Sequence, residues 1–321
     1  MTAIQMNTLR EDLSFGVRIT GVSETALQDE AVREQIRQAF DDRGLIVFEG
    51  VEPTNRLQVE LSLVFGPLKD HPVDAVDLVD PDYMRGAIQI SSNPETSDIV
   101  EIDGKPYSSW LPWHFDHCYN NELNRAGVLR AVQITPNGGQ TCFMDGVELY
   151  KLISPRLRER IEGHSVIYSM DMQPAHLRFG RPKNFRVLQV DPAQLAILEQ
   201  AKTFPRAIHP AVWTRTTGEK VLHVSPWMAE GIEGLENPEG DALLESVASE
   251  INRIADAGAY IHDWKPTDML IWDNWRMLHR VTGCTPPHPR SIYRTTIEGD
   301  YGLGRFENNE QGRYKDLERT V

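Results

Sequence analysis

Two histidines and one aspartate that lie far apart in the chain constrain its fold more than any other feature. His114 and Asp116 are separated by Phe115, and His279 follows much further along the sequence. On an extended strand, residues two apart project from the same face, so the imidazole and the carboxylate share a direction. With His279 they make two imidazoles and one carboxylate, the set that holds non-haem Fe(II) with coordination positions left open. A fold that uses all three must bring two distant segments together.

Open positions on such an iron allow a cosubstrate and O₂ to bind together, which indicates an oxygenase. A single His-x-Asp pair occurs by chance in many chains, so the neighbouring motifs decide its weight. Trp113 precedes the pair, and residues 138–141 (Gly-Gly-Gln-Thr) follow it. The distal histidine ends residues 272–279 (Trp-Asp-Asn-Trp-Arg-Met-Leu-His), and Arg290 and Arg294 come after it. Together these motifs are a specific indication of a metal site, which the His-x-Asp pair alone is not.

The two arginines suit anionic ligands. Arginine presents a planar fork that binds a carboxylate through two hydrogen bonds, whereas lysine offers a point charge. A dicarboxylate that chelates iron at one end needs such an anchor at its other end. The plainer alternatives are a solvated loop arginine after Pro289 for Arg290 and a solvent-facing strand residue for Arg294.

These motifs resemble the taurine / 2,4-dichlorophenoxyacetate dioxygenase (TauD/TfdA) family, whose members depend on Fe(II) and 2-oxoglutarate. The similarity extends from residues 16–22 (Gly-Val-Arg-Ile-Thr-Gly-Val) to residues 296–300 (Thr-Ile-Glu-Gly-Asp). The resemblance implies that His114, Asp116 and His279 are the iron ligands. It also implies Fe(II) as metal, with 2-oxoglutarate and O₂ as cosubstrates.

The same resemblance implies roles for four further residues. Arg290 matches the family arginine that clamps the far carboxylate of 2-oxoglutarate, and Thr141 matches the residue that hydrogen-bonds that carboxylate. Arg294 and His71 match positions that hold the anionic group of the substrate in the taurine enzyme.

Asp74 departs from the family pattern, because taurine-specific members carry a tyrosine at this position. A carboxylate beside an anion pocket would repel a sulfonate, which argues against taurine as the substrate. Asp74 therefore either faces a cationic or hydroxylated part of the substrate or points to solvent, and the sequence leaves both alternatives open.

Asp116 favours hydroxylation over halogenation, since related halogenases replace this carboxylate by a small residue so that chloride can bind iron. The resemblance implies hydroxylation of a C–H bond in a small anionic substrate, with release of succinate and CO₂. The product would collapse to a carbonyl compound where the hydroxylated carbon carries a heteroatom leaving group. Two alternatives remain, a zinc-type metallohydrolase with the same His/Asp/His site and a non-catalytic binding module with a vestigial site.

Composition limits the possible binding partners and the cellular compartment of the protein. The net charge of −14 argues against nucleic acid as a partner. The sequence has no run of eighteen apolar residues and no visible signal peptide, so we expect neither a membrane span nor export. The three cysteines (Cys118, Cys142 and Cys284) show no paired spacing, which favours a reducing cytoplasm. By family resemblance we expect a homo-oligomer, either a dimer or a tetramer.

The pattern of short apolar runs predicts a mainly β fold with flanking helices and a double-stranded β-helix core, a jelly roll of the cupin-like type. Because the proposed ligands span more than half of the chain and no linker is visible, we expect a single domain over residues 1–321. Predicted strands cover residues 45–48, 87–91, 126–134, 141–144, 164–169, 269–272 and 291–297, with a hairpin between 207–214 and 220–225. Predicted helices cover residues 25–43, 53–65, 147–161 and 241–255.

Residues 171–204 show no clear period and are rich in Arg, Pro and Gln. Long segments of this kind are usually functional loops or disordered. By family resemblance we expect here a lid over the active site, and the alternative is a surface insertion. Candidates for the wall of the substrate pocket are Trp110, Tyr119, Phe179 and Trp227.

Overall fold

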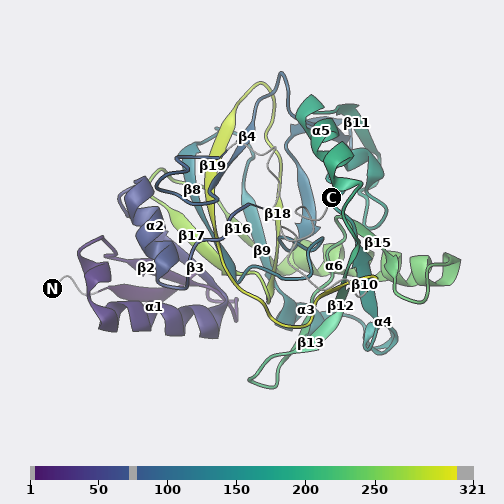
Figure 1. Cartoon of the computed structure of the whole chain (residues 1–321), viewed down its shortest axis with the longest axis horizontal. Helices are drawn as coiled ribbons and strands as arrows, with labels where there is room; N and C mark the ends of the chain where they lie inside the picture. Colours follow the sequence, from purple (N-terminus) through teal and green to yellow (C-terminus); the bar gives the residue numbers. More distant parts are fainter. Residues whose placement is uncertain (1–3, 72–77, 309–321) are drawn as a thin grey trace.

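Two facing β-sheets form the centre of the protein (Figure 1). The computed structural model describes residues 4–71 and 78–308. The larger sheet has seven strands, in the order β1 (Gln5–Thr8), β2 (Val17–Thr20), β3 (Leu45–Glu49), β17 (Met269–Asp273), β8 (Ala126–Gln133), β19 (Arg290–Ile297) and β4 (Ile88–Ser92). The smaller has four, in the order β16 (Tyr260–His262), β9 (Thr141–Asp145), β18 (Met277–Val281) and β7 (Leu111–His114).

Apolar side chains from both sheets meet between them. Leu270 and Trp272 of β17 and Ile292 of β19 pack against Phe143 of β9 and Met277 of β18 in one buried cluster. Burial of this apolar surface holds the two layers together. The predicted mainly β fold with a jelly-roll core is therefore confirmed.

Two helices, α1 (Glu30–Arg43) and α2 (Asn55–Leu63), contribute to the core on the other side of the larger sheet, as Figure 1 shows at the N-terminal end. Asp29 caps α1 by accepting a hydrogen bond from the Ala31 amide at 2.9 Å. Gly44 ends α1 in a left-handed conformation (φ 72°), which glycine adopts without steric cost. The helix is thus shorter than the predicted 25–43, because a 3-10 turn, η1 (Ala26–Gln28), precedes the cap.

Three helices and a further sheet pack against the smaller of the two central sheets. The helices are α3 (Gly146–Leu152), α4 (Pro155–Ile161) and α6 (Pro238–Gly258). The sheet runs in the order β15 (Ala229–Ile232), β10 (Ser165–Tyr168), β12 (Ala207–Pro210) and β20 (Arg305–Phe306). No helix within the described ranges is both long and apolar enough to cross a membrane.

Two predicted elements are divided in the structure. The single helix predicted over 147–161 is interrupted because Pro155 lacks an amide hydrogen and disfavours helical geometry at Ser154, whose ψ is 137°. In the predicted hairpin, only β13 (Val212–Thr214) pairs with β14 (Lys220–Leu222), while β12 joins the sheet of β10.

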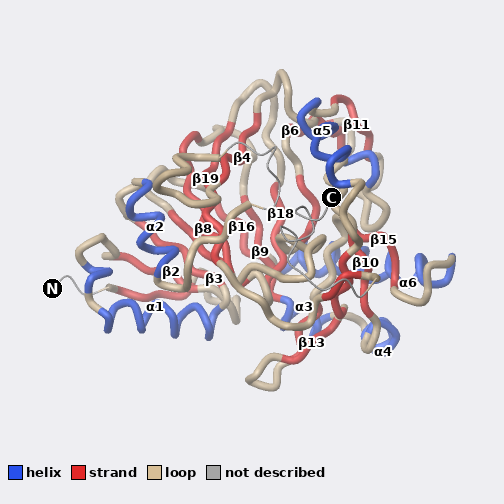
Figure 2. Tube along the Cα trace, in the orientation of Figure 1, coloured by secondary structure: helices blue, strands red, loops and turns tan. Residues whose placement is uncertain are grey.

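Residues 171–204 contain regular elements, in contrast to the expected loop (Figure 2). They form the 3-10 turn η2 (Pro174–His176), strand β11 (Phe185–Gln189) and helix α5 (Pro192–Ala201). Strand β11 pairs with β5 (Ile99–Ile102), which pairs in turn with β6 (Lys105–Ser108). Residues 185–189 form a strand because they pair with residues 99–102, which are distant in the chain. A local sequence pattern does not reveal such a pairing.

Two fully buried histidines, His209 and His223, form hydrogen bonds between segments that are far apart in the chain. His209 donates through Nε2 to the Asn120 carbonyl at 2.7 Å and accepts through Nδ1 from the Tyr301 hydroxyl at 2.6 Å. His223 donates through Nε2 to the Asn274 carbonyl at 3.0 Å. Burial lowers the pKa of His209 to about 4 and the pKa of His223 to about 3.

Stability should fall on mild acidification because these imidazoles are buried in their neutral form. An unfolded histidine titrates near pH 6.5, so the stabilisation is complete above that pH and is lost as the pH falls towards 4. Each histidine should cost about 2 kcal/mol between pH 7 and pH 5. Urea unfolding at both pH values measures this loss, which should shrink by about half in His209→Gln or His223→Gln. Equal stability of the parent protein at both pH values would contradict the assignment.

Candidate metal and cosubstrate site

The pairing of β18 with β7 brings the two histidines together. His279 on β18 lies directly opposite His114, the last residue of β7. Their rings lie 4.0 Å apart between centroids. Asp116 follows two residues beyond the strand end, so the loop and not the strand directs its carboxylate.

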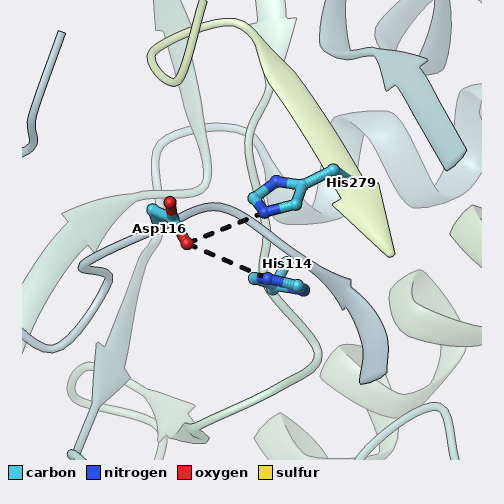
Figure 3. Close-up of side chains that lie close together, drawn as sticks. All are labelled: His114, Asp116 and His279. Atoms are coloured by element: carbon cyan, nitrogen blue, oxygen red, sulfur yellow. Dashed lines mark ion pairs between the residues drawn. The ribbon is translucent and has the colours of Figure 1, made fainter. Parts of the chain in front are cut away.

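The carboxylate of Asp116 faces both imidazoles (Figure 3). Its Oδ1 lies 3.6 Å from His279 Nε2 and 4.0 Å from His114 Nε2. One ligand atom from each of the three residues lies within 4.8 Å of the others, and all three residues are buried. His114 Nδ1 donates to the Pro112 carbonyl at 2.7 Å, which leaves Nε2 with its lone pair towards Asp116. This donor set fits a divalent metal ion of the iron type.

The three candidate ligands are in the protonation states that metal binding requires. Burial lowers the pKa of both His114 and His279, which keeps the imidazoles neutral. Burial by itself would raise the pKa of the Asp116 carboxyl. The charge of Arg294 and the neighbouring imidazoles outweigh that effect, and the pKa lies below its usual value.

Asn274 clamps the backbone of Asp116. Its side-chain Oδ1 accepts from the Asp116 amide at 2.8 Å, and its Nδ2 donates to the Asp116 carbonyl at 3.0 Å. The same Nδ2 donates to Asn124 Oδ1 at 3.0 Å. Asn274 belongs to the turn between β17 and β18, so it ties the loop of Asp116 to the segment that carries His279. Sequence reasoning noted the Trp-Asp-Asn motif but missed this role, which depends on a contact between residues 158 positions apart.

Arg290 and Thr141 also lie together. Arg290 Nη2 donates to Thr141 Oγ1 at 3.3 Å, and Trp264 Nε1 donates to the same oxygen at 3.1 Å. With both of its lone pairs engaged, the Thr141 hydroxyl has its own hydrogen left to donate to an acceptor. A Cβ at Gly139 would lie 2.9 Å from Arg290 Cδ, so the glycine leaves room for the arginine.

Arg290 is a buried cation without a counterion. It is 4% exposed, and no carboxylate in the described part of the chain forms an ion pair with it. Burial lowers the pKa of its guanidinium to about 10. Burying an unpaired charge costs free energy, and an anionic ligand bound beside Arg290 would offset that cost.

Arg294 projects from β19 towards the metal-ligand set and not towards solvent. Its Nη1 donates to Asp116 Oδ2 at 2.8 Å, while its buried Nε has no hydrogen-bond partner in the described structure. Oδ1 of the same carboxylate faces the histidines. Arg294 therefore orients Asp116, a contact that was not foreseen from the sequence.

A cavity of about 320 Å³ between the two sheets connects these groups. His71, Thr141, Arg290 and Arg294 line it together with the three candidate metal ligands. Among the expected wall residues, Trp110, Tyr119 and Trp227 line the cavity. Phe179 does not, since it lines a separate groove of about 890 Å³. Asp74 lies outside the described residues.

Residues of the segment 171–204 reach the same cavity. Met172, Asp191, Gln194 and Ile197 contribute to its lining. Sequence reasoning did not single out His117, which also lines the cavity and follows Asp116 directly. No motif marks this residue, and only its burial and position in the fold identify it.

A jelly roll that carries a buried His-Asp-His set beside an unpaired arginine is typical of oxygenases that use 2-oxoglutarate. The chain belongs to the TauD/TfdA family, because the family model described as "Taurine catabolism dioxygenase TauD, TfdA family" matches residues 8–296. It is a 2-oxoglutarate-dependent dioxygenase that uses Fe(II), 2-oxoglutarate and O₂. The resemblance inferred from the sequence is thereby confirmed.

Among curated relatives, the chain is 28% identical to (S)-phenoxypropionate/alpha-ketoglutarate-dioxygenase of Sphingobium herbicidovorans, over 90% of this chain and 93% of the relative. It is 26% identical to the alpha-ketoglutarate-dependent 2,4-dichlorophenoxyacetate dioxygenase of Cupriavidus pinatubonensis, over 93% and 99% of the two chains. The crystal structure of a taurine dioxygenase from Burkholderia xenovorans has the same fold, with a TM-score of 0.68 at 23% identity, covering 96% of this chain and 94% of that one.

Replacing Asn274 by alanine should weaken metal binding without unfolding the protein. The Asp116 loop would lose its two hydrogen bonds, and the loss of such outer contacts typically costs about 10- to 100-fold in metal affinity. Anaerobic equilibrium titration with Fe(II) measures the effect. The exposed Asn7 on β1, replaced by alanine, is a matched control. Wild-type iron affinity in Asn274→Ala would show that the clamp does not position the ligand.

Proposed function

We propose that His114, Asp116 and His279 hold the Fe(II), and that Arg290 and Thr141 bind the far carboxylate of 2-oxoglutarate. The observation that carries this proposal is the buried Arg290, which has no counterion among the described residues, in the same cavity as three convergent candidate ligand atoms. A dicarboxylate spanning from metal to arginine would satisfy both. Arg290 and the Thr141 hydroxyl then supply charge-assisted hydrogen bonds to one carboxylate.

When bound, the iron with 2-oxoglutarate and O₂ supplies the power to oxidise an unactivated C–H bond, with 2-oxoglutarate converted to succinate and CO₂. The residues of the chain fix the geometry for that step. Asn274 and Arg294 orient Asp116 from two sides, and the Pro112 carbonyl fixes the ring of His114. Apolar walls that include Trp227 and Trp272 keep water from the site.

The proposed reaction is hydroxylation of a small anionic substrate. Arg294 and His71 line the cavity next to Asp116 and would attract an anionic group. The two curated relatives carry the names of aryloxyalkanoates in which an ether oxygen is attached to the carbon beside a carboxylate. Hydroxylation of such a carbon in this chain's substrate would give a hemiacetal-type product that collapses to a carbonyl compound and an alcohol or phenol.

We also propose that residues 171–204 act as a lid on a single domain spanning 1–321. Support comes from Met172, Gln194 and Ile197, which line the cavity although they lie outside the two facing sheets. Closure of such a segment over bound substrate would exclude water.

A zinc-type metallohydrolase is less well supported. His₂-carboxylate also suits catalytic zinc, but a hydrolase has no use for the buried Arg290–Thr141 pair. Family membership likewise favours the oxygenase. Succinate formation that requires Fe(II) and 2-oxoglutarate separates the two functions.

Arg290→Gln should weaken 2-oxoglutarate binding by about 100-fold and leave iron binding intact, because truncating a buried charged pair costs about 2–5 kcal/mol. Anaerobic titration of the iron-loaded protein, followed by the visible charge-transfer band of chelated 2-oxoglutarate, gives the affinity. Arg280→Gln, which removes an ion pair between β18 and Asp256 of helix α6, is the control. Unchanged affinity in Arg290→Gln would remove the basis of the proposal.

Arg294→Ala should raise the KM for an anionic substrate by about tenfold or more, because a hydrogen bond to a charged group contributes about 1.5–3 kcal/mol. The affinity for 2-oxoglutarate should change much less. Since Arg294 also orients Asp116, Arg294→Lys serves as the companion variant that keeps a cation there. Steady-state kinetics with separate 2-oxoglutarate titrations distinguishes these effects. A wild-type KM in Arg294→Ala would rule out the anion pocket.

A further inference from the structure

His117 is buried beside the metal-ligand set with both ring nitrogens unsatisfied. It is 4% exposed and follows Asp116 directly. Neither Nδ1 nor Nε2 has a hydrogen-bond partner among the described residues. His209, another buried histidine, has hydrogen-bond partners on both ring nitrogens, Tyr301 and Asn120. The contrast indicates that His117 is placed to bind a partner other than the residues that the structure describes.

Burying an imidazole without a hydrogen-bond partner is energetically unfavourable. Leaving a buried polar group unpaired costs about 1–3 kcal/mol. The backbone at His117 adds to this, since its φ of 60° lies in the left-handed region that non-glycine residues seldom adopt. Such features cluster at functional sites, where the strain is part of the working geometry.

The surroundings of His117 favour an anionic partner. It lines the 320 Å³ cavity together with Arg294 and His71. The ring of His71 lies 6.2 Å from that of His117 between centroids, at an interplanar angle of 85°. Arg294 uses Nη1 for Asp116, and its Nε is unpartnered. His117 and Arg294 therefore offer N–H donors at one end of the cavity, next to Asp116.

We propose that His117 is a specificity-determining residue that donates a ring N–H to the anionic group of the substrate, alongside Arg294. This inference rests on the proposed anionic substrate of the same site. A neutral analogue of equal shape would leave the donors at this end of the cavity without an acceptor. Such mismatches are a strong source of discrimination in buried polar sites.

The test uses the full-length protein loaded with Fe(II) and 2-oxoglutarate under anaerobic conditions. Perturbation of the visible charge-transfer band reports the dissociation constants of (S)-2-phenoxypropionate, 2,4-dichlorophenoxyacetate and hexyl sulfate, with 2-phenoxyethanol as the neutral analogue. His117→Phe removes the donor at similar size, and His117→Gln keeps an N–H. The half-buried His164, which does not line the cavity, provides the control variant His164→Gln.

In His117→Phe we expect the tightest of the three anions to bind about tenfold more weakly, with the 2-oxoglutarate band unchanged and the neutral analogue little affected. His117→Gln should recover most of the affinity. Equal anion binding in His117→Phe and the parent protein, or a fall in melting temperature alone, would overturn the proposal. So would a parent protein that responds to none of the anions.

Failure of the proposed function has a different signature. If the parent protein gives no charge-transfer band with Fe(II) and 2-oxoglutarate, the assignment of the metal and cosubstrate residues fails. A normal band combined with no effect of His117 substitution refutes only the role of His117.

Discussion

The site depends on the antiparallel pairing of β18 with β7. Because His279 and His114 are direct cross-strand partners, their rings are brought within 4.0 Å regardless of the long chain between them. The pairing is supported on one side by β9, which carries Thr141, and by the apolar contacts between the two sheets. One ladder thus positions two candidate metal ligands and, through β9, one candidate cosubstrate residue.

The third candidate ligand is held by polar contacts and not by a strand. Asp116 lies past the end of β7, and Asn274 takes the place of a neighbouring strand by bonding to both its amide and its carbonyl. Arg294 then fixes one carboxylate oxygen and leaves the other facing the histidines. Each of these groups is buried, so each contact is made in a medium of low dielectric, where it is strong and where its loss is costly.

The cavity contains more positive charge than the described residues neutralise, although the protein as a whole carries a net charge of −14. Arg290 has no carboxylate partner in the described structure, and Arg294 shares Asp116 with the histidines. In an oxygenase that takes a dicarboxylate as cosubstrate, this local excess of positive charge is compensated by the ligands. Overall acidity and an anion-binding interior are compatible because the buried arginines lie close to the ligand and are little screened, whereas the acidic groups on the surface are further away and are screened by solvent.

Local sequence patterns were sufficient to predict the residue types of the candidate site and several of the helices and strands. The His-x-Asp pair, the distal histidine and the two arginines could be chosen from their chemistry and spacing, and the buried strand 45–48 and the helix ending at Gly44 follow from apolar runs and capping signals. The contacts of Arg294 and Asn274 with Asp116 became visible only in the folded structure. The same is true of the burial of His117, which has no hydrogen-bond partner among the described residues. The tertiary structure also decided that residues 185–189 form a strand, since their partner lies in residues 99–102. These features arise from contacts between residues far apart in the chain, and a local pattern contains no information about which distant atom will satisfy a buried donor or acceptor.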